Sequence, residues 1–360
     1  MIRVLFVGGG SLGHLTPSLA VWEAIKKKES KAKCLFVCSS RLQDRKFLSI
    51  NKIRKTPIYV PKISNLLGII LFPIFFPLAC AHSLVIILLF RPHVIFSKGG
   101  YVSVPVCIVG WLLMRPIVLH ESDRVMGKAN RSLIRFAKHL CIGTPQKELA
   151  DKDIMARTDV IITATGNPIR ERLLTGSKDG GRRVTGFSGK RPAVLVIGGS
   201  QGAQILNEAV WQDLEKLIDL CDVLHLTGSG KMKREVSHAH YWQKESVYED
   251  LENIYAFADI VISRAGAGAI AELSALGKAS ILVPLPEKVQ KHQKENAHFL
   301  ETAGSAIVLD QKSLAETLVP TVRSLIDDEN KRISLGNRMK SISDPNSADR
   351  IANILLETAR

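Results

Sequence analysis

The sequence predicts an α/β protein with two Rossmann-like domains in tandem, each built on a parallel sheet, with the two sheets facing a deep cleft. Short apolar runs alternate with helical stretches along the chain, which is typical of parallel strands covered by helices. A strand, a Gly/Ser turn and a helix start occur together twice, from Val4 and from Val194. The 360 residues are enough for two domains that each bury a core.

Ten apolar runs are the expected strands. They read IRVLFVG, KCLFVC, HVIFS, PIVLH, HLCIG and VIITA in the first half, and AVLVIGG, DVLHLTG, DIVIS and ASILVP in the second. Gly166 and Pro168 follow the sixth run, so we expect a hinge there, between an N-terminal domain at 1–163 and a C-terminal domain at 164–344. A last helix within 345–360 follows the breaker Asp-Pro-Asn and is expected to pack back on the first domain.

The first glycine loop has the spacing Gly-x-Gly-x-x-Gly from Gly8 and follows the first expected strand. Its glycines would let backbone N–H groups approach a phosphate, and the next helix would add its positive dipole end. NAD is disfavoured, because Ser-Ser-Arg at 39–41 stands where an acidic residue would hold the ribose. Arg41 and Arg45 could hold the extra phosphate of NADP, so a reductase stays open, as does a turn that binds nothing.

Two further features point to phosphate chemistry. His14, at the start of the helix after the first loop, is placed to act as a base or as a phosphate contact, and the sequence leaves both roles open. The stretch SRAGAGAIAEL from Ser263 brings small residues to a helix N-terminus that a diphosphate could approach. Glu272 could then accept both hydroxyls of a ribose; the alternative is an Ala-rich packed helix with a solvated Glu.

The excess basic charge lies in the first half of the chain. The net charge is +15, and residues 1–163 hold 24 Lys and Arg against 9 Asp and Glu. Such an excess indicates an anionic partner, either nucleic acid or an acidic membrane surface. Nucleic acid is disfavoured, because the basic residues lack aromatic interleaving and any known reading motif.

Residues 63–90 contain no Lys, Arg, Asp or Glu and are long enough for a transmembrane helix. Pro73 and Pro77 are expected to interrupt any helix in this segment. Three interpretations stay open: a surface that dips into one membrane leaflet, a helix of the protein core, and a true span.

Seven motifs follow one another along the whole chain: GGGSLGHLTPSLAV, GGYVSVP, VLHESDRVMGKANR, TGNPIR, GGSQGAQILN, SRAGAGAIAE and HQKENA. Together they resemble the MurG family, bacterial glycosyltransferases that add N-acetylglucosamine to lipid I in peptidoglycan synthesis. The resemblance implies the GT-B fold, with UDP-N-acetylglucosamine held by the second domain and lipid I by the first. The chain would then be a hexosyltransferase that forms lipid II and serves cell-wall biogenesis, cell shape and cell division.

The resemblance also implies partners and a location. The partners would be the two substrates, the anionic inner-membrane surface and other proteins of cell-wall synthesis or division, with no nucleic acid. The chain would lie on the cytoplasmic face of the bacterial inner membrane as a peripheral protein.

Site residues follow from the matching motifs. His14 would be the catalytic base and Glu121 the second candidate. Residues implied at the donor are Ser11, Leu12, Gly13, Asp123, Arg170, Ser200, Tyr248, Ala267, Gly268, Ala269, Ile270, Ala271, Glu272 and Gln293. Residues implied at the acceptor or its diphosphate are Gly10, Gly99, Gly100, Tyr101 and Asn130. Among them, Glu272 would hold the uridine ribose, Tyr248 would line the uracil pocket and Gln293 would contact the sugar.

The chain departs from the family pattern at several of these positions. Ser11 and Leu12 stand where the family has Thr and Gly, and Asp123 stands where it has Asn. A carboxylate at 123 loses a hydrogen-bond donor and adds negative charge near a diphosphate, unless a cation such as Arg124 compensates. Gly268 also removes a side chain that the family usually has at the nucleotide.

The expected chemistry is an inverting displacement at the anomeric carbon of the donor by a sugar hydroxyl of lipid I. The helix N-terminus at 265–269 and Arg170 would spread the charge of the leaving UDP. No Asp-x-Asp pair occurs in the site motifs, so we expect no metal and no other cofactor. Other GT-B glycolipid glycosyltransferases, an epimerase acting on UDP-N-acetylglucosamine, the NADP reductase and a catalytically degenerate membrane-bound scaffold stay open as alternatives.

Overall fold

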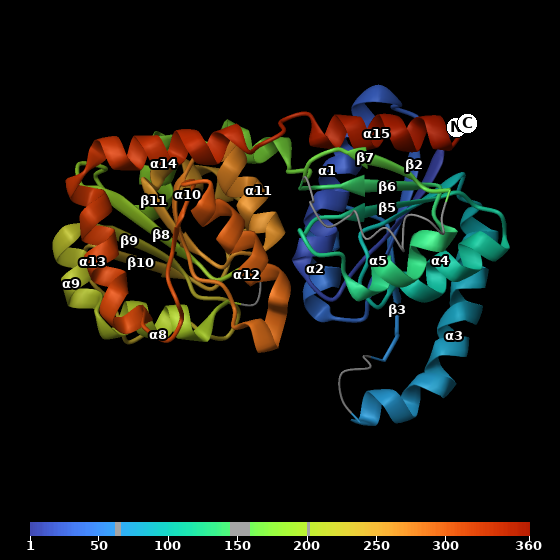
Figure 1. The fold of residues 1–360 in the computed structure, drawn as a ribbon, viewed down its shortest axis with the longest axis horizontal. Coiled ribbons are helices and arrows are strands. Elements are labelled where there is room, and N and C mark those ends of the chain that lie inside the picture. The colour runs from blue at the N-terminus through green and yellow to red at the C-terminus, as the bar shows by residue number, and fades with distance from the viewer. Residues whose placement is uncertain (62–65, 145–158, 200–201) are drawn as a thin grey trace. The chain divides into compact units, whose positions relative to one another are not determined.

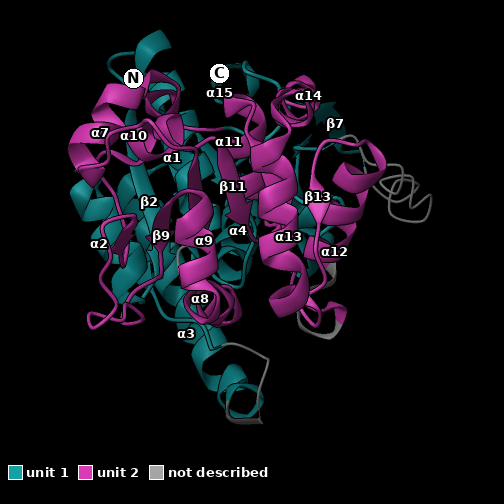
Figure 2. Ribbon diagram, turned by 90° about the vertical axis from the view of Figure 1, so that its left-hand side faces the viewer, with its two compact units in different colours: residues 1–168, 344–360 teal, residues 169–343 magenta. Residues whose placement is uncertain are grey.

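The computed structural model describes residues 1–61, 66–144, 159–199 and 202–360. The chain divides into two compact units, one formed by residues 1–168 with 344–360 and the other by residues 169–343 (Figure 2). The junction lies between Pro168 and Ile169, so residues 164–168 belong to the first unit.

The first unit contains a seven-stranded parallel sheet in the order β3-β2-β1-β4-β5-β6-β7. Its strands are β1 (Arg3–Val7), β2 (Lys33–Ser39), β3 (Lys55–Ile58), β4 (Val94–Ser97), β5 (Ile117–Glu121), β6 (His139–Ile142) and β7 (Ile161–Ala164). Its helices are α1 (Leu12–Lys28), α2 (Leu42–Ile50), α3 (Leu66–Phe90), α4 (Ser103–Leu112), α5 (Lys128–Leu133), the short 3-10 helix η1 (Ile134–Phe136) and α15 (Ser347–Thr358) (Figure 1). The strand order reverses between β1 and β4, which is where open α/β sheets bind their ligands.

Packing within the first unit follows from its apolar strands. Phe6 of β1 stacks on Phe36 at 4.6 Å between ring centroids and meets Phe96 edge-on at 5.6 Å. Helix α15 packs on α1 (Figure 1), and Lys28 pairs with Asp349 at 3.1 Å. The last helix of the chain therefore belongs to the first unit.

Helix α3 contradicts one expectation from the sequence, because it continues through Pro73 and Pro77 without ending. Each proline removes one backbone N–H donor and bends a helix at its ring. A helix of 25 residues keeps most of its backbone hydrogen bonds after two such losses. The prolines therefore bend α3 rather than end it, and its ribbon bends in Figure 1.

The second unit repeats the strand order of the first with a six-stranded parallel sheet, β10-β9-β8-β11-β12-β13. Its strands are β8 (Ala193–Ile197), β9 (Asp222–Leu226), β10 (Tyr241–Lys244), β11 (Ile260–Ser263), β12 (Ala279–Leu282) and β13 (Ile307–Val308). Its helices are η2 (Glu171–Thr175), α7 (Lys178–Thr185), α8 (Gln204–Gln212), α9 (Leu214–Leu220), α10 (Leu251–Phe257), α11 (Ala267–Leu276), α12 (Glu287–Thr302), α13 (Leu314–Asp327) and α14 (Glu329–Ser341). Side chains of α8, α9 and α13 fill one face of the sheet, and those of α10, α11 and α12 fill the other.

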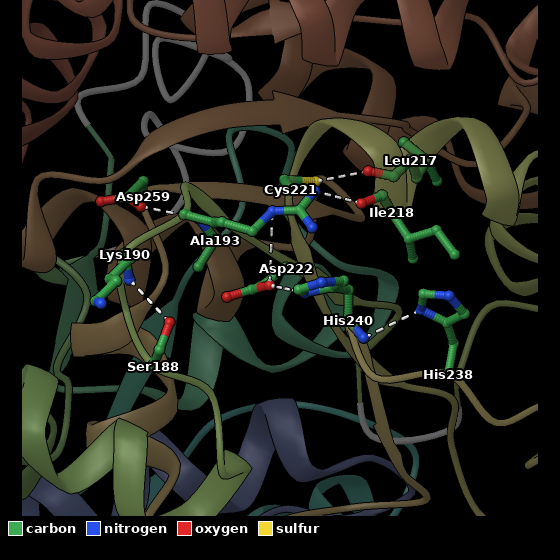
Figure 3. Close-up of polar contacts among 11 residues, drawn as sticks. Ser188, Lys190, Ala193, Leu217, Ile218, Cys221, Asp222, His238, His240 and Asp259 are labelled. Carbon is green, nitrogen blue, oxygen red and sulfur yellow. Dashed lines mark hydrogen bonds and ion pairs between the residues drawn. The ribbon is translucent and has the colours of Figure 1, made fainter.

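A polar cluster ties the amino ends of these strands together (Figure 3). Asp222, at the start of β9, is buried and accepts a hydrogen bond from His240 Nδ1 at 2.7 Å, just before β10. Asp259, just before β11, accepts from the backbone N–H of Ala193 at 2.9 Å and pairs with Lys178 at 3.3 Å. The cluster thus aligns neighbouring strands at their amino ends. The glycine loops follow the carboxyl ends of strands and therefore lie at the opposite end of the sheet.

Candidate active site

The first glycine loop, residues 8–11, connects β1 to α1 and positions His14. His14 Nδ1 lies 2.9 Å from the carbonyl oxygen of Gly9. Because a carbonyl only accepts, Nδ1 carries the proton and Nε2 keeps its lone pair. Nε2 makes no hydrogen bond to any residue in the described part of the chain, and the side chain is partly exposed. The arrangement is that of a neutral imidazole with a free basic nitrogen.

The surroundings of His14 keep it neutral. Burial is the largest effect and lowers the pKa of His14 below its ordinary value. The positive charge of Lys98 lowers this pKa further, whereas the hydrogen bond to Gly9 and the charges of Glu121 and Asp123 raise it. A general base must be unprotonated at the working pH, and a lowered pKa meets that requirement.

Asp44, on α2, holds the first glycine loop in place through hydrogen bonds. Its buried carboxylate accepts hydrogen bonds from the backbone N–H of Gly10 at 2.7 Å and from Ser39 Oγ at 2.6 Å. Arg41 Nη1 donates to the carbonyl oxygen of Gly10 at 2.8 Å. The N–H of Gly10, expected at the acceptor diphosphate, is therefore already donated within the protein. Arg41, considered for the phosphate of NADP, instead closes the loop.

The second glycine loop, residues 99–101, follows β4 and packs on the first. Gly99 and Gly100 have φ values of +78° and +81°, which favour glycine. A β-carbon at Gly100 would lie 3.1 Å from His14 Cε1, and one at Gly10 would lie 2.8 Å from the Tyr101 ring. The structure thus brings Gly10, Gly100, Tyr101 and His14 together where β1 and β4 end.

Glu121, at the end of β5, is buried and hydrogen-bonded on both oxygens. One oxygen accepts from the backbone N–H of Asp123 at 3.1 Å, and the other accepts from the N–H of Gly127 and from Asn130 Nδ2, both at 2.9 Å. Asn130 also donates to the carbonyl of His120 at 3.1 Å and is buried, with its Oδ1 beside Gly99. Both side chains hold the loop after β5, which carries Asp123.

In the second unit, the helix N-terminus of α11 is open. Gly266 caps the helix, and Ala267, Gly268 and Ala269 form its first turn. A β-carbon placed on Gly266 or Gly268 would meet no atom within 4 Å among the described residues. The positive end of the helix dipole therefore faces space that an anion can enter. Ile270 and Ala271 continue the helix, partly exposed.

Glu272 lies one turn along α11 and interacts with two residues from other elements. Tyr255 of α10 is fully buried, and its hydroxyl donates to Glu272 Oε2 at 3.0 Å. Burial raises the pKa of Glu272, and the charge of Arg170 and the Tyr255 hydrogen bond act against that rise. Arg170, just before η2, has its Nε buried without a hydrogen-bond partner in the described part of the chain. The second unit thus brings Arg170 and Glu272 into one electrostatic group.

The remaining donor-side residues take different positions. Gln293 on α12 is buried and accepts from the backbone N–H of Leu285 at 3.2 Å, which ties α12 to the segment after β12. Tyr248 lies partly exposed between β10 and α10. Ser200 falls outside the described residues. Within the described ranges, no group of three or more His, Cys, Asp or Glu is placed to hold a metal ion, and the expectation that no metal is needed stays a prediction.

The sequence reasoning did not single out Asp44, Lys98 or Tyr255. Asp44 bonds Gly10 from 34 positions away and Tyr255 bonds Glu272 from 17 positions away, so no local pattern reveals either contact. Lys98 directly precedes the second glycine loop, and this position beside the loop is the sequence feature that could have indicated it.

An apolar surface is exposed on α3 and α4 of the first unit. It is formed by Ile69, Ile70, Ile74, Leu78, Leu84, Val85, Leu88, Leu89, Trp111 and Leu112. Leu89 is 82% exposed and Ile74 61%. By length and composition alone, residues 68–90 could cross a membrane, and little of this helix is buried within the protein. The interpretation as a core helix is therefore wrong for most of α3.

The glycosyltransferase family 28 N-terminal domain matches residues 4–142, and the C-terminal domain of the same family matches residues 193–351. A UDP-N-acetylglucosamine--N-acetylmuramyl-(pentapeptide) pyrophosphoryl-undecaprenol N-acetylglucosamine transferase of Legionella pneumophila is 32% identical over 99% of this chain and 97% of its own. The protein of that name from Clostridium kluyveri is 33% identical over 99% of both chains.

Among solved structures, MurG of Acinetobacter baumannii superposes with a TM-score of 0.72 at 22% identity, covering 99% of this chain and all of that one. The UDP-GlcNAc 2-epimerase of Neisseria meningitidis superposes with a TM-score of 0.69 at 14% identity, with the same coverage. At these identities both structures report on the fold alone.

Proposed function

Because the chain belongs to the MurG family of glycosyltransferases, we propose that it transfers N-acetylglucosamine from UDP-N-acetylglucosamine to lipid I, forming lipid II for peptidoglycan. Its two domains have the GT-B fold. In the structure, one observation carries the proposal: His14 Nδ1 lies 2.9 Å from the Gly9 carbonyl at a glycine loop, so that Nε2 of the neutral ring can accept a proton. The proposed acceptor chemistry needs a base of this kind.

The proposed reaction is a single inverting displacement. The reacting hydroxyl oxygen of lipid I forms a bond to the anomeric carbon of the donor sugar, and its proton passes to His14 Nε2. The bond from that carbon to the diphosphate oxygen breaks, and UDP leaves with the bonding electrons. Glu121 is the weaker candidate for the base, because both of its oxygens already accept hydrogen bonds from its own loop.

The donor side of the proposal rests on α11. Its open N-terminus and the Arg170 guanidinium would stabilise the negative charge that develops on UDP. Glu272 would accept the ribose hydroxyls through the lone pairs that Tyr255 leaves available. Ser200 and Tyr248 would contact the donor, and Gln293 would contact its sugar. No step of this mechanism needs a metal ion.

The same proposal places the apolar surface of α3 and α4 on the cytoplasmic face of the inner membrane, as a peripheral contact. Exposed apolar side chains are stabilised in the acyl region, and the basic residues of the first domain attract anionic headgroups. Lipid I carries an undecaprenyl chain, so an enzyme that uses it must work at a membrane surface. Flotation with liposomes tests this association.

The experiment that tests the function is transfer of labelled N-acetylglucosamine from its UDP donor to a lipid I analogue by the purified protein. UDP-N-acetylgalactosamine and UDP-glucose are the matched control donors. We expect a disaccharide lipid with N-acetylglucosamine alone. UDP binding without any transfer would indicate another acceptor or a catalytically degenerate scaffold, and formation of an epimerised sugar, free or still linked to UDP, would indicate an epimerase.

A further inference from the structure

Lys98 is a buried cation at the edge of the proposed acceptor site. It lies between β4 and the second glycine loop, and only 4% of it is exposed. Buried lysines are rare in proteins unless an anion pairs with them, because removing an ammonium from water is costly.

The protein partners of Lys98 are neutral. Its Nζ lies 2.5 Å from His120 Nδ1 and also donates to Ser122 Oγ. His120 Nε2 lies 3.1 Å from the carbonyl of Gly166 and must donate to it, so Nδ1 is unprotonated and accepts from Lys98. Burial, followed by the charge of Lys98, holds the pKa of His120 well below its ordinary value. His120 is thus an uncharged acceptor.

In the described part of the chain, no carboxylate oxygen lies within ion-pair distance of Lys98 Nζ. Glu121 and Asp123 act on it through their charges from farther away, and the oxygens of Glu121 are engaged by its own loop. An ammonium has three donors, and two of them meet uncharged atoms. The described residues therefore give Lys98 no direct ion-pair partner, and the carboxylates of Glu121 and Asp123 balance its charge only from a distance.

The charge of Lys98 reaches the glycine loops. A β-carbon at Gly8 would lie 3.2 Å from the β-carbon of His14 and 3.4 Å from that of Lys98. Because Gly8 has no side chain, the β-carbons of His14 and Lys98 can both lie close to it. Lys98 also lowers the pKa of His14. The ammonium is consequently part of the electrostatics at the ends of β1 and β4.

We propose that Lys98 supplies the positive charge that balances a bound diphosphate at the second glycine loop, and that this diphosphate is the one on the lipid acceptor. The assignment rests on the proposed function, and both substrates of that reaction contain a diphosphate. The acceptor is favoured because Lys98 lies in the domain that carries the exposed apolar surface, where a lipid would approach.

The proposal predicts that the affinity for the diphosphate depends on pH. Burial lowers the pKa of Lys98 to about 8, against the opposing charges of Glu121, Asp123 and Cys141. Among the described residues, His14 on α1 and His120 on β5 also interact with Lys98. A bound diphosphate favours the charged ammonium and raises this pKa. Affinity is therefore fully present below pH 8 and falls as the pH rises above 8.

The test compares Lys98→Met with a matched control, Lys278→Met. Lys278, in the second domain, donates to the carbonyl of Ala258 at 2.7 Å, and burial lowers its pKa to about 8 as well. The probes are a short-chain prenyl diphosphate without sugar, and UDP. Binding of each is measured from pH 6.5 to 9.5 on the intact protein, with thermal unfolding of every variant. Lys98→Gln serves if Lys98→Met does not fold.

We expect Lys98→Met to bind prenyl diphosphate about 10- to 100-fold more weakly and to lose the decline above pH 8, with UDP binding unchanged. Lys278→Met should behave as the wild type. Unchanged prenyl diphosphate binding, or a loss confined to UDP, would overturn the proposal. A wild type whose affinity for prenyl diphosphate declines no more than its affinity for UDP above pH 8 would overturn it without any variant.

Failure of this proposal is distinguishable from failure of the proposed function. If the wild type makes lipid II while Lys98→Met keeps the wild-type affinity for prenyl diphosphate, the function holds and the role of Lys98 is wrong. If diphosphate binding depends on Lys98 but no sugar is transferred, the proposed role of Lys98 is supported and the proposed transferase activity is wrong.

Discussion

At the scale of single residues, the protonation state of His14 controls the expected pH dependence of transfer. Burial and Lys98 lower its pKa, and the proposed base must be neutral to accept the proton of the acceptor hydroxyl. The rate should therefore fall as the pH drops through this pKa, with the midpoint below the ordinary imidazole value of 6.5. Steady-state kcat/KM measured from pH 4.5 to 8 checks this.

The matching variant is His14→Ala, which removes the proposed base. We expect kcat to fall by about 10²- to 10⁴-fold and the acid limb of the profile to disappear. His298→Ala is the control, because His298 is an exposed imidazole on α12 that the site does not use. An acid limb with the same midpoint in His14→Ala would assign the limb to another group.

Tyr255 predicts a separate effect on donor binding. Tyr255→Phe removes the O–H that holds Glu272 Oε2, so Glu272 should lose its orientation and its pKa should rise further. We expect KM for UDP-N-acetylglucosamine to rise about tenfold, with kcat and the acceptor KM nearly unchanged. Steady-state kinetics with each substrate varied in turn measures kcat and the KM of each substrate.

The control for Tyr255→Phe is Tyr241→Phe. Tyr241 is also buried, and its hydroxyl bonds Trp211 Nε1 and His225 Nδ1, each at 2.9 Å, in a different cluster. Equal losses in both variants would show that a general loss of packing, rather than the position of Glu272, causes the change.

The sequence predicts where the glycine loops lie but not which hydrogen bonds form inside them. The Gly-rich turns and His14 are local patterns, and in the structure Gly100 lies beside His14 and Gly10 beside Tyr101. Glu121 could be placed at a strand end, yet its motif does not tell whether its oxygens face a substrate or its own loop. That depends on the backbone N–H groups of Asp123 and Gly127, whose direction is a property of the folded loop.

At the scale of elements, sequence patterns identified the central strands and missed β3, β10 and β13. All three lie at sheet edges. Central parallel strands are buried on both faces and are nearly continuous apolar runs, whereas edge strands carry charged, polar or proline residues. The sequences KTPI and YWQK show this composition, and β13 is only two residues long. The missed strands are thus those without the expected signal.

Helix α3 predicts an effect of charge on membrane binding. Ile74 and Leu78 are exposed by 61% and 58% and lie four positions apart, on one face of the helix. Replacing both by Glu should lower binding to liposomes at least about tenfold, because two apolar side chains lose their burial in lipid. Liposome flotation measures the loss.

Ile333→Glu provides the control for that pair. Ile333 is 53% exposed on α14 of the second domain, so its replacement should leave flotation unchanged. Turnover of a short-chain, water-soluble acceptor should be the same in all variants. Undiminished flotation of the α3 variant would show that this apolar surface does not contact the membrane.

At the scale of the whole molecule, apolar and basic features are concentrated in the same domain. Residues 1–163 carry 24 basic against 9 acidic residues, whereas residues 164–360 carry 25 of each. The apolar surface belongs to the first of these segments. Such a division suits a protein in which one domain meets an anionic surface and the other binds a soluble nucleotide sugar.

This division predicts how membrane binding responds to salt. Attraction between basic residues and anionic headgroups is screened by salt, whereas burial of apolar side chains is not weakened by it. Binding to vesicles with anionic lipid should therefore fall strongly between about 0.1 M and 1 M salt, to the level found with neutral vesicles, where binding should change little. The α3 pair Ile74→Glu and Leu78→Glu should reduce that residual binding further. If salt abolished binding to both kinds of vesicle, electrostatics alone would hold the protein there. If salt had no effect on either, the basic residues of the first domain would serve the diphosphate of the substrate rather than the membrane.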